Sequence, residues 1–382
     1  MNILIVPSWY ISDSNRILGS FFREQAVALR KAGHNVSLAY VYMRGSQELL
    51  TSKLFRIQKY DDEGVKTYCY NIPSLGSMKR GTWFQKNTRA YRKLLRYVLA
   101  KEPVELIHAH SFVPAGFAMV SLKEEFHLPV VYTEHFSGVH RDSLSPEKKD
   151  ALKKTVNGAD RVLAVSQALK HAMLAQVPER SDVEVVPNII SPLFYTEDEK
   201  KPKETFHIIS IGSLTPGKRH DLTIRAFHAA FDKDIRVRLD IIGGGPSLLS
   251  LQSLVSELGE ESRIFLSGRK SREDTANQLR HSDLFVLPSD SETFGVVYAE
   301  ALASGVPVIG SRNGGFEDIY EDNCGYMIDV GDMDALTAAM KDAYVNIHRF
   351  DPASLSEMAR KKYSEKTVIE MLERIYAGVM KG

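Results

Sequence analysis

The sequence predicts an α/β protein made of two Rossmann-like, doubly wound domains that face each other across a cleft, with a closing helix at the C-terminus. Apolar, β-branched runs alternate with longer amphipathic stretches along the whole chain, which is typical of βαβ units and parallel sheets. The 382 residues exceed one ordinary domain, and an apolar content of 43% is enough for two cores. Ligand sites in such domains lie at the carboxyl ends of the strands, so we expect the active site in the cleft.

The predicted strands fall into two sets. The first domain, residues 1–195, contains NILIVPSW (2–9), NVSLAYVY (35–42), VELIHAH (104–110), LPVVYTEH (128–135), RVLAVS (161–166) and VEVVPN (183–188). The second, residues 205–363, contains FHIISIGS (206–213), VRLDIIGG (237–244), RIFLSG (263–268), DLFVLP (283–288) and VPVIGS (306–311). Between them SPLFYTEDEKKPKET is polar and interrupted by proline, which indicates a linker with the boundary near 195–204. Residues 364–382 have helical spacing, and we expect this helix to pack back toward the first domain.

Composition excludes several classes of protein. Lysine plus arginine (49) nearly balances aspartate plus glutamate (48), which argues against a nucleic-acid partner. Cys69 and Cys324 are far apart, with neither metal-ligand spacing nor a disulfide framework, as expected in a reducing cytosol. The start MNILIVPSWY does not resemble a signal peptide, and no run of 18 apolar residues occurs. We therefore expect a cytoplasmic protein, peripheral at most at the inner face of the cell membrane.

The segment ETFGVVYAEA, residues 292–301, follows the apolar run DLFVLP and contains two glutamates eight positions apart. A helix is predicted from about Thr293 to Ala303, and the backbone amides of residues 294–296 at its N-terminus would favour a phosphate. A carboxylate accepts two hydroxyl groups at once, so Glu292 would hold sugar hydroxyls and Glu300 a ribose, on either side of a diphosphate. This describes a nucleotide sugar.

In the alternative interpretation Glu292 is an ordinary cap-region acid and Glu300 lies on a solvated helix face. A glycosidase also uses two carboxylates, but a helix N-terminus in a doubly wound domain suits nucleotide binding better.

Other polar motifs are less informative. His108 and His110 lie on one face of a predicted strand, but no carboxylate or cysteine completes a metal site, so they are interpreted as cleft-lining or structural. IIGGGP lacks the G-x-G-x-x-G spacing of dinucleotide-binding proteins, and LTPGKRHD lacks the spacing of a P-loop. A dehydrogenase or nucleoside triphosphatase is therefore a poor interpretation.

Taken together, these motifs resemble those of the family 4 retaining glycosyltransferases, which have the two-domain GT-B fold. The resemblance covers nearly the whole chain and rests on PSWY…LGSFFREQA, VYTEHFSG, GSLTPGKRHD, GGGP, LSGR and ETFGVVYAEA with ASGVPVI. It implies a metal-independent, retaining transfer of a hexose-type sugar, without a cofactor, from a UDP- or GDP-linked donor. The acceptor would be a glycan or a lipid-linked glycan precursor of cell-surface polysaccharide. A catalytically silent nucleotide-sugar-binding protein and a GT-B phosphorylase or epimerase are the alternatives.

The resemblance also implies roles for individual residues. Catalysis falls to His135, Lys218 and Glu292, with Lys218 neutralising the leaving diphosphate. Donor binding falls to Gly19, Ser213, Arg219, Gly244, Arg269, Thr293, Phe294, Gly295, Val296 and Glu300. The sequence departs from the family at Ser213, where an arginine is usual. Either Arg219 supplies the missing charge, or Arg219 is a surface residue and the diphosphate relies on Lys218 and the helix amides.

Residues 78–101 contain eight basic residues and no acidic one, with Trp83, Phe84, Tyr91, Leu94 and Tyr97 between them. Such a stretch is able to lie against an anionic membrane surface. Alternatively, it forms a solvated helix whose apolar side packs on the first domain.

Overall fold

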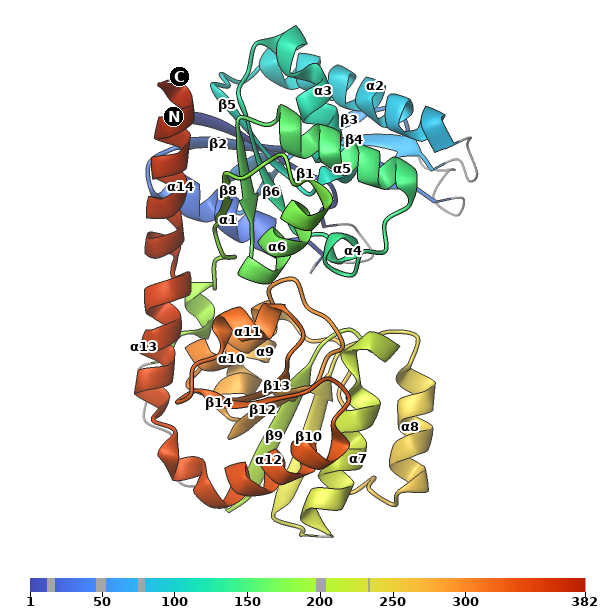
Figure 1. The fold of residues 1–382 in the computed structure, drawn as a ribbon, viewed down its shortest axis with the longest axis vertical. Coiled ribbons are helices and arrows are strands. Elements are labelled where there is room, and N and C mark those ends of the chain that lie inside the picture. The colour runs from blue at the N-terminus through green and yellow to red at the C-terminus, as the bar shows by residue number, and fades with distance from the viewer. Residues whose placement is uncertain (12–17, 46–52, 75–79, 197–203, 233, 382) are drawn as a thin grey trace. The chain divides into compact units, whose positions relative to one another are not determined.

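The computed structural model describes residues 1–11, 18–45, 53–74, 80–196, 204–232 and 234–381, without the side chains of residues 80 and 81 (Figure 1). The chain divides into two compact units. Unit 1 comprises Met1–Ile189 and Glu365–Gly382, and unit 2 comprises Ile190–Ser364. Each is an α/β domain with its own sheet.

Unit 1 contains an eight-stranded sheet in the order β3-β4-β2-β1-β5-β6-β7-β8. Every neighbouring pair is parallel except β3 and β4. The strands are β1 (Asn2–Pro7), β2 (Asn35–Arg44), β3 (Ile57–Asp62), β4 (Val65–Pro73), β5 (Leu106–His110), β6 (Val130–Glu134), β7 (Arg161–Ala164) and β8 (Val183–Val185). The strands that pair on both sides are buried throughout their centres, which explains why their sequences are apolar runs rather than alternating patterns.

Helices cover both faces of this sheet. They are α1 (Ser20–Lys31), α2 (Arg80–Leu99), α3 (Phe117–Phe126), α4 (Ser137–His140), α5 (Pro146–Gly158), α6 (Gln167–Gln176) and α14 (Glu365–Met380), with a single turn, η2 (Phe112–Gly116), before α3. One core cluster joins α1 and α14 to the sheet, and another joins α2 and α3 to it. The C-terminal helix α14 buries Val368, Leu372 and Tyr376 in the first of these clusters.

The hairpin β3–β4 is absent from the sequence prediction. β3 is an edge strand of mainly polar, partly exposed residues, and β4 pairs on both sides but contains Lys66, Thr67 and Asn71, so neither forms the continuous apolar run that marks the other strands. Glu63 and Gly64 form the tight turn, with φ of 52° and 85°. Positive φ at both central residues is the geometry that closes a two-residue hairpin.

Unit 2 contains a six-stranded parallel sheet in the order β11-β10-β9-β12-β13-β14. Its strands are β9 (Phe206–Ile211), β10 (Val237–Ile242), β11 (Ile264–Leu266), β12 (Leu284–Leu287), β13 (Val308–Ser311) and β14 (Gly325–Ile328). The sequence analysis missed β14, a four-residue edge strand. The helices are α7 (His220–Phe231), α8 (Leu248–Glu257), α9 (Arg272–Arg280), α10 (Val296–Ala303), α11 (Gly315–Ile319), α12 (Met333–Asn346) and α13 (Pro352–Tyr363).

Residues 190–196, which precede the undescribed part of the linker, belong to unit 2. Leu193 O accepts a hydrogen bond from Arg280 at 2.8 Å, and Phe194 O accepts one from the hydroxyl of Ser304 at 3.0 Å. Residues 197–203 of the predicted linker lie outside the described residues. These contacts place the division between the units at Ile189, a few residues before the predicted linker.

Candidate active site

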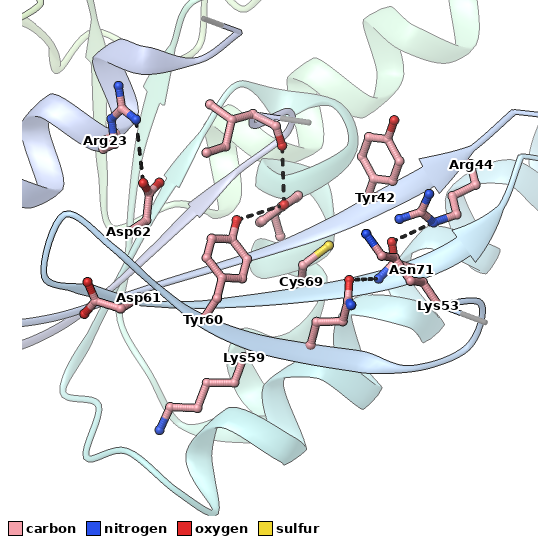
Figure 2. A pocket seen from close by; sticks show the side chains of 13 residues that line it. Arg23, Tyr42, Arg44, Lys53, Lys59, Tyr60, Asp61, Asp62, Cys69 and Asn71 are labelled. Atoms are coloured by element: carbon pink, nitrogen blue, oxygen red, sulfur yellow. Dashed lines mark hydrogen bonds and ion pairs between the residues drawn. The ribbon is translucent and has the colours of Figure 1, made fainter. Parts of the chain in front are cut away.

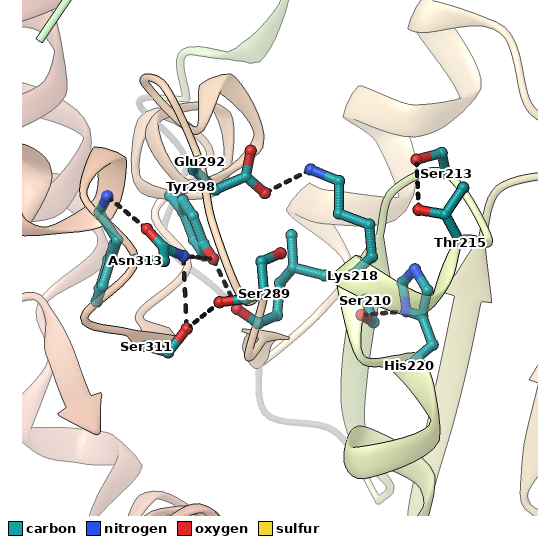
Figure 3. Close-up of polar contacts among 12 residues, drawn as sticks. Ser210, Ser213, Thr215, Lys218, His220, Ser289, Glu292, Tyr298, Ser311 and Asn313 are labelled. Carbon is teal, nitrogen blue, oxygen red and sulfur yellow. Dashed lines mark hydrogen bonds and ion pairs between the residues drawn. The ribbon is translucent and has the colours of Figure 1, made fainter. Parts of the chain in front are cut away.

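Two loops of unit 2 bring together the lysine and the glutamate singled out in the sequence. Lys218 ends a single turn, η4 (Pro216–Lys218), after β9, and Glu292 lies in the loop after β12. Lys218 Nζ forms an ion pair with Glu292 Oε1 (Figure 3). The backbone amide of Glu292 donates to Asn313 O at 2.9 Å. The pair therefore joins loops from three neighbouring strands at the carboxyl edge of the sheet, where α/β domains bind ligands.

Hydrogen bonds of the Tyr298 side chain fix the loop that holds Glu292. This buried side chain donates to Leu287 O at 2.6 Å and accepts from Asn313 Nδ2 at 3.0 Å (Figure 3). Its ring also leaves no room for a side chain on Gly295, because a Cβ there would lie 2.5 Å from the Tyr298 ring. Gly295 has a φ of 79°, so both space and backbone conformation require glycine.

Helix α10 begins at Val296 with Gly295 as its N-cap, about one turn later than predicted from Thr293. The left-handed conformation of Gly295 delays the first helical residue. Phe294 is buried, and Thr293 and Val296 are half-buried. The first amides of a helix have no acceptor within the helix, so this end is suited to an anion. That Phe294, Gly295 and Val296 bind a phosphate remains a prediction.

Glu300 is not on a solvated face, as the alternative interpretation held, because it is only 2% exposed. Its carboxylate forms an ion pair with Arg272 Nη1 from the start of α9. Burial raises the pKa of Glu300, and the charge of Arg272 opposes that effect. The predicted ribose contact of Glu300 would therefore have to be made beside Arg272.

Arg219 follows Lys218 and is the N-cap residue of α7. Its side chain forms ion pairs with Asp290 at 3.2 Å and Asp221 at 3.5 Å. Ser213, which stands where the family has arginine, is exposed, and its hydroxyl lies 3.5 Å from that of Thr215 (Figure 3). Two carboxylates thus already balance the charge of Arg219, whereas a single carboxylate, that of Glu292, balances the charge of Lys218.

Gly244 and Arg269 lie together on the loops after β10 and β11. A Cβ on Gly244 would lie 2.8 Å from Arg269 Nε, so the absence of a side chain at Gly244 lets Arg269 cross this loop. Arg269 is exposed. Base contact by this pair is likewise a prediction.

In unit 1, His135 follows β6 and is 9% exposed. Gly19 is the N-cap of α1, and the rings of Phe21 and Phe22 on that helix each lie 5.1 Å from the His135 ring, centroid to centroid. The structure therefore brings Gly19 and His135 into one region of unit 1. His108 and His110 are fully buried behind them. Of the two interpretations given for these histidines, cleft-lining or structural, their burial agrees with the structural one.

A polar cavity of about 420 Å³ opens on the outer strands of unit 1 (Figure 2). Strand alternation puts Tyr40, Tyr42 and Arg44 of β2 on one face of the sheet. Arg44 is 6% exposed, and its Nε donates to Asn71 Oδ1 at 2.9 Å. The remaining lining includes Lys53, Gln58, Lys59, Tyr60, Asp61 and Asp62. Tyrosine rings with amides and cations form a lining suited to a hydroxyl-rich ligand.

The basic stretch forms helix α2, and Met78 and Lys79 lie outside the described residues. Tyr91 and Leu94 are buried in the core, which agrees with the packed-helix alternative for the apolar side. Arg92 and Arg96 form ion pairs with Glu125 at 2.7 and 2.9 Å.

Membrane contact stays a prediction, to be tested by sedimentation with anionic vesicles at low and high salt. In the described segments, no helix combines the length and the apolar character needed to cross a bilayer.

Four residues of the site escaped the sequence analysis: Arg272, Asp290, Asn313 and His220. Arg272, Asp290 and Asn313 each contact a residue that is distant in sequence, which no local pattern encodes. His220 was detectable in principle, because it opens a helix directly after the Lys218 turn. It is 2% exposed, and burial, followed by the nearby charge of Lys218, lowers its pKa to about 4.

Two family models match the chain and together cover most of it. The model described as Glycosyltransferase Family 4 matches residues 18–192, and the model described as Glycosyl transferases group 1 matches residues 194–362.

Curated relatives show the same relationship. N-acetyl-alpha-D-glucosaminyl L-malate synthase of Bacillus anthracis is 26% identical over 299 residues, which are 74% of this chain and 77% of the relative. An uncharacterized glycosyltransferase of Methanocaldococcus jannaschii is 29% identical over 297 residues, which are 75% and 80% of the two chains.

Solved structures share the fold over essentially the full length. Sucrose-phosphate synthase of Thermosynechococcus elongatus superposes with a TM-score of 0.79 at 18% identity and covers 100% of both chains. HepE of Anabaena, in complex with UDP, superposes with a TM-score of 0.75 at 18% identity and covers 99% of this chain and 100% of HepE.

Proposed function

The chain belongs to the family 4 glycosyltransferases of the GT-B fold, and from that premise we propose that it transfers a hexose-type sugar from a nucleoside diphosphate sugar, with retention of configuration and without a metal ion. The observation that carries the proposal is the Lys218–Glu292 ion pair beside the N-terminus of α10. This pair combines a cation for a diphosphate with a carboxylate for sugar hydroxyls.

The chemistry follows from the charges. When the donor's sugar–phosphate bond breaks, negative charge develops on the leaving diphosphate, and a fixed cation stabilises it. Lys218 would exchange Glu292 for the diphosphate, while the first amides of α10 hold a second phosphate oxygen. Glu292, released from Lys218, would accept hydrogen bonds from two sugar hydroxyls. The complex of HepE with UDP supports a nucleotide as the donor's leaving group.

For the acceptor we propose a glycan or lipid-linked glycan precursor. The polar cavity on β2, β3 and β4 supports a hydroxyl-rich acceptor, because it is lined by tyrosines, amides and cations. A relative whose name includes a lipid is the GDP-mannose-dependent alpha-(1-6)-phosphatidylinositol monomannoside mannosyltransferase of Mycolicibacterium smegmatis, which is 29% identical over 225 residues, 54% of this chain and 59% of that enzyme.

Thermal unfolding with UDP, GDP and ADP in turn identifies the donor's base, because a ligand of the native state raises the melting temperature. Transfer from the matching sugar nucleotide is then measured with and without EDTA. We expect activity to persist in EDTA and Glu292→Gln to abolish transfer while the nucleotide still binds. The exposed Glu257→Gln on α8 is the matched control and should leave both unchanged. Activity that requires added Mg²⁺ or Mn²⁺ contradicts the metal-independent mechanism, and binding without any transfer would leave a silent binding protein.

A further inference from the structure

Polar contacts join the turn that carries Lys218 to the loop that carries Glu292. Lys218 Nζ forms an ion pair with Glu292 (Figure 3). The backbone amide of Asp290 donates to Gly217 O at 2.9 Å. Arg219 Nη1 forms a second ion pair, at 3.2 Å from Asp290 Oδ1. All of these residues belong to unit 2, so the attachment of turn to loop is a property of that unit alone.

The turn of Lys218 needs a support other than Glu292 during the transfer proposed above. A lysine side chain is a long, flexible stem, so its ammonium group is placed only as well as the backbone that carries it. When Glu292 turns to the sugar hydroxyls, its ion pair with Lys218 is lost. The two contacts of Asp290 do not involve Glu292, so they are able to hold the turn while the donor is bound.

The backbone at position 219 favours glycine over arginine. Arg219 has a φ of 53°, in the left-handed region that glycine adopts freely and that other residues adopt at a cost. An unfavourable backbone conformation that is retained points to a use for the side chain. The ion pair with Asp221, at 3.5 Å, stays within helix α7. The ion pair with Asp290 instead connects the loop after β9 to the loop after β12.

We propose that Arg219 is a positioning residue of the transferase: its ion pair with Asp290 holds the turn of Lys218 against the loop of Glu292 and so places the Lys218 ammonium group for the leaving diphosphate. This rests on the proposed function for the identity of the ligand, whereas the two loops are attached without one. Arg219 acts through Lys218 and makes no contact of its own with the diphosphate. This role differs from both sequence interpretations, a replacement for the family arginine and a surface residue.

Two substitutions break the ion pair from its two ends. Arg219→Gly removes the cation and accepts the same φ, so we expect little change in the melting temperature. Asp290→Ala removes the carboxylate and keeps the backbone hydrogen bond to Gly217. Because glycine also loosens the backbone, an effect is assigned to the ion pair where both variants share it. Asp221→Ala is the matched control, since it removes the carboxylate on α7 and leaves the attachment to Asp290 in place.

The first readout needs no donor. It is hydrogen–deuterium exchange of the unliganded full-length chain, measured by mass spectrometry. When a contact between the loops is lost, the turn opens more often, and its amides exchange faster. We expect peptides that cover residues 214–219 to exchange faster than in the wild type in Arg219→Gly and Asp290→Ala, and at the wild-type rate in Asp221→Ala.

The second readout is steady-state transfer from the sugar nucleotide that the thermal screen identifies. A partly exposed ion pair has a modest effect, so we expect kcat to fall about fivefold in Arg219→Gly and in Asp290→Ala. The double variant should lose no more than either single variant, because both remove the same contact. In a Lys218→Gln background, Arg219→Gly should cause no further loss, whereas a general loss of structure would still lower turnover.

Binding affinity separates positioning from direct contact. If Arg219 bound the diphosphate itself, Asp290→Ala would release it and tighten the binding of UDP, GDP or ADP, whichever stabilises the wild type, and Arg219→Gly would weaken that binding. Opposite changes of this kind in titration calorimetry overturn the proposal. Additive losses in the double variant, wild-type exchange in Asp290→Ala, or an equal response in Asp221→Ala overturn it as well.

A failure of the proposed function would appear separately from a failure of this inference. A wild-type chain that transfers no sugar, while Arg219→Gly and Asp290→Ala exchange faster as expected, rejects the transferase function and confirms the attachment of the two loops. An active wild type whose exchange and kcat do not respond to either substitution rejects the positioning role alone.

Discussion

Lys218 and Arg219 are adjacent cations that differ in how much of their charge is available to a ligand. Arg219 pairs with both Asp290 and Asp221, whereas Lys218 pairs with Glu292, a residue that we expect to turn to the sugar. A group already balanced by two carboxylates gains less from a diphosphate, because new contacts would replace old ones. We therefore expect Lys218, rather than Arg219, to carry the contact with the diphosphate.

Lys218→Gln should accordingly lower turnover by about 100-fold, since a positioned donor to the developing charge is lost. Arg219→Gln should have a clearly smaller effect. Steady-state kinetics with the cognate sugar nucleotide measures both, with Lys341→Gln on the exposed side of α12 as a control for charge alone. A larger loss in Arg219→Gln than in Lys218→Gln would assign the role to Arg219.

At the scale of elements, an ion pair between half-buried Arg272 and buried Glu300 joins α9 and α10. Glu300 is 2% exposed and Arg272 stacks on Phe194, its guanidinium carbon 4.7 Å from the ring centre. Removing one partner of a buried pair leaves the other charge without compensation, which is more costly than losing the pair as a whole.

Arg272→Ala should therefore lower the free energy of unfolding by about 3 kcal/mol, and Arg272→Met with Glu300→Leu should recover part of that loss. Urea denaturation followed by circular dichroism measures the change. Arg225→Ala, an exposed arginine on α7, should shift the free energy by less than about 0.5 kcal/mol. Equal stability of Arg272→Ala and Arg225→Ala would show that the pair contributes nothing.

The elements also show where sequence patterns succeed and fail. Buried parallel strands such as β1, β9 and β12 were predictable, because burial on both faces demands continuous apolar runs. The edge strands β3 and β14 were missed, because an edge strand needs fewer apolar residues, and β4 was missed because Lys66, Thr67 and Asn71 interrupt its apolar residues. Glu292 and Lys218 were found through a motif, but Arg272 and Asn313 were not, since their roles depend on contacts made only after folding.

At the scale of the whole molecule, the two units differ in their buried histidines. Unit 1 contains His108, His110 and His135, and unit 2 contains His220, each with its pKa lowered chiefly by burial. A histidine that stays neutral in the native state but takes up a proton near pH 6.5 when unfolded stabilises the protein above that pH. This contribution is lost as the pH falls from 6.5 toward the native pKa values.

Unit 1 should therefore be the more acid-sensitive unit. Each such histidine removes up to about 1.4 kcal/mol of stability per pH unit below 6.5, so three of them in unit 1 outweigh one in unit 2. Both tryptophans of the chain, Trp9 and Trp83, lie in unit 1, so tryptophan fluorescence follows that unit, while far-ultraviolet circular dichroism follows both. In urea titrations at pH 7.5 and 5.5, the urea concentration at the fluorescence midpoint should fall more between the two pH values than the urea concentration at the dichroism midpoint, to which unit 2 also contributes. Fluorescence and dichroism midpoints that fall together would mean that the buried histidines do not distinguish the units, or that the units unfold as one.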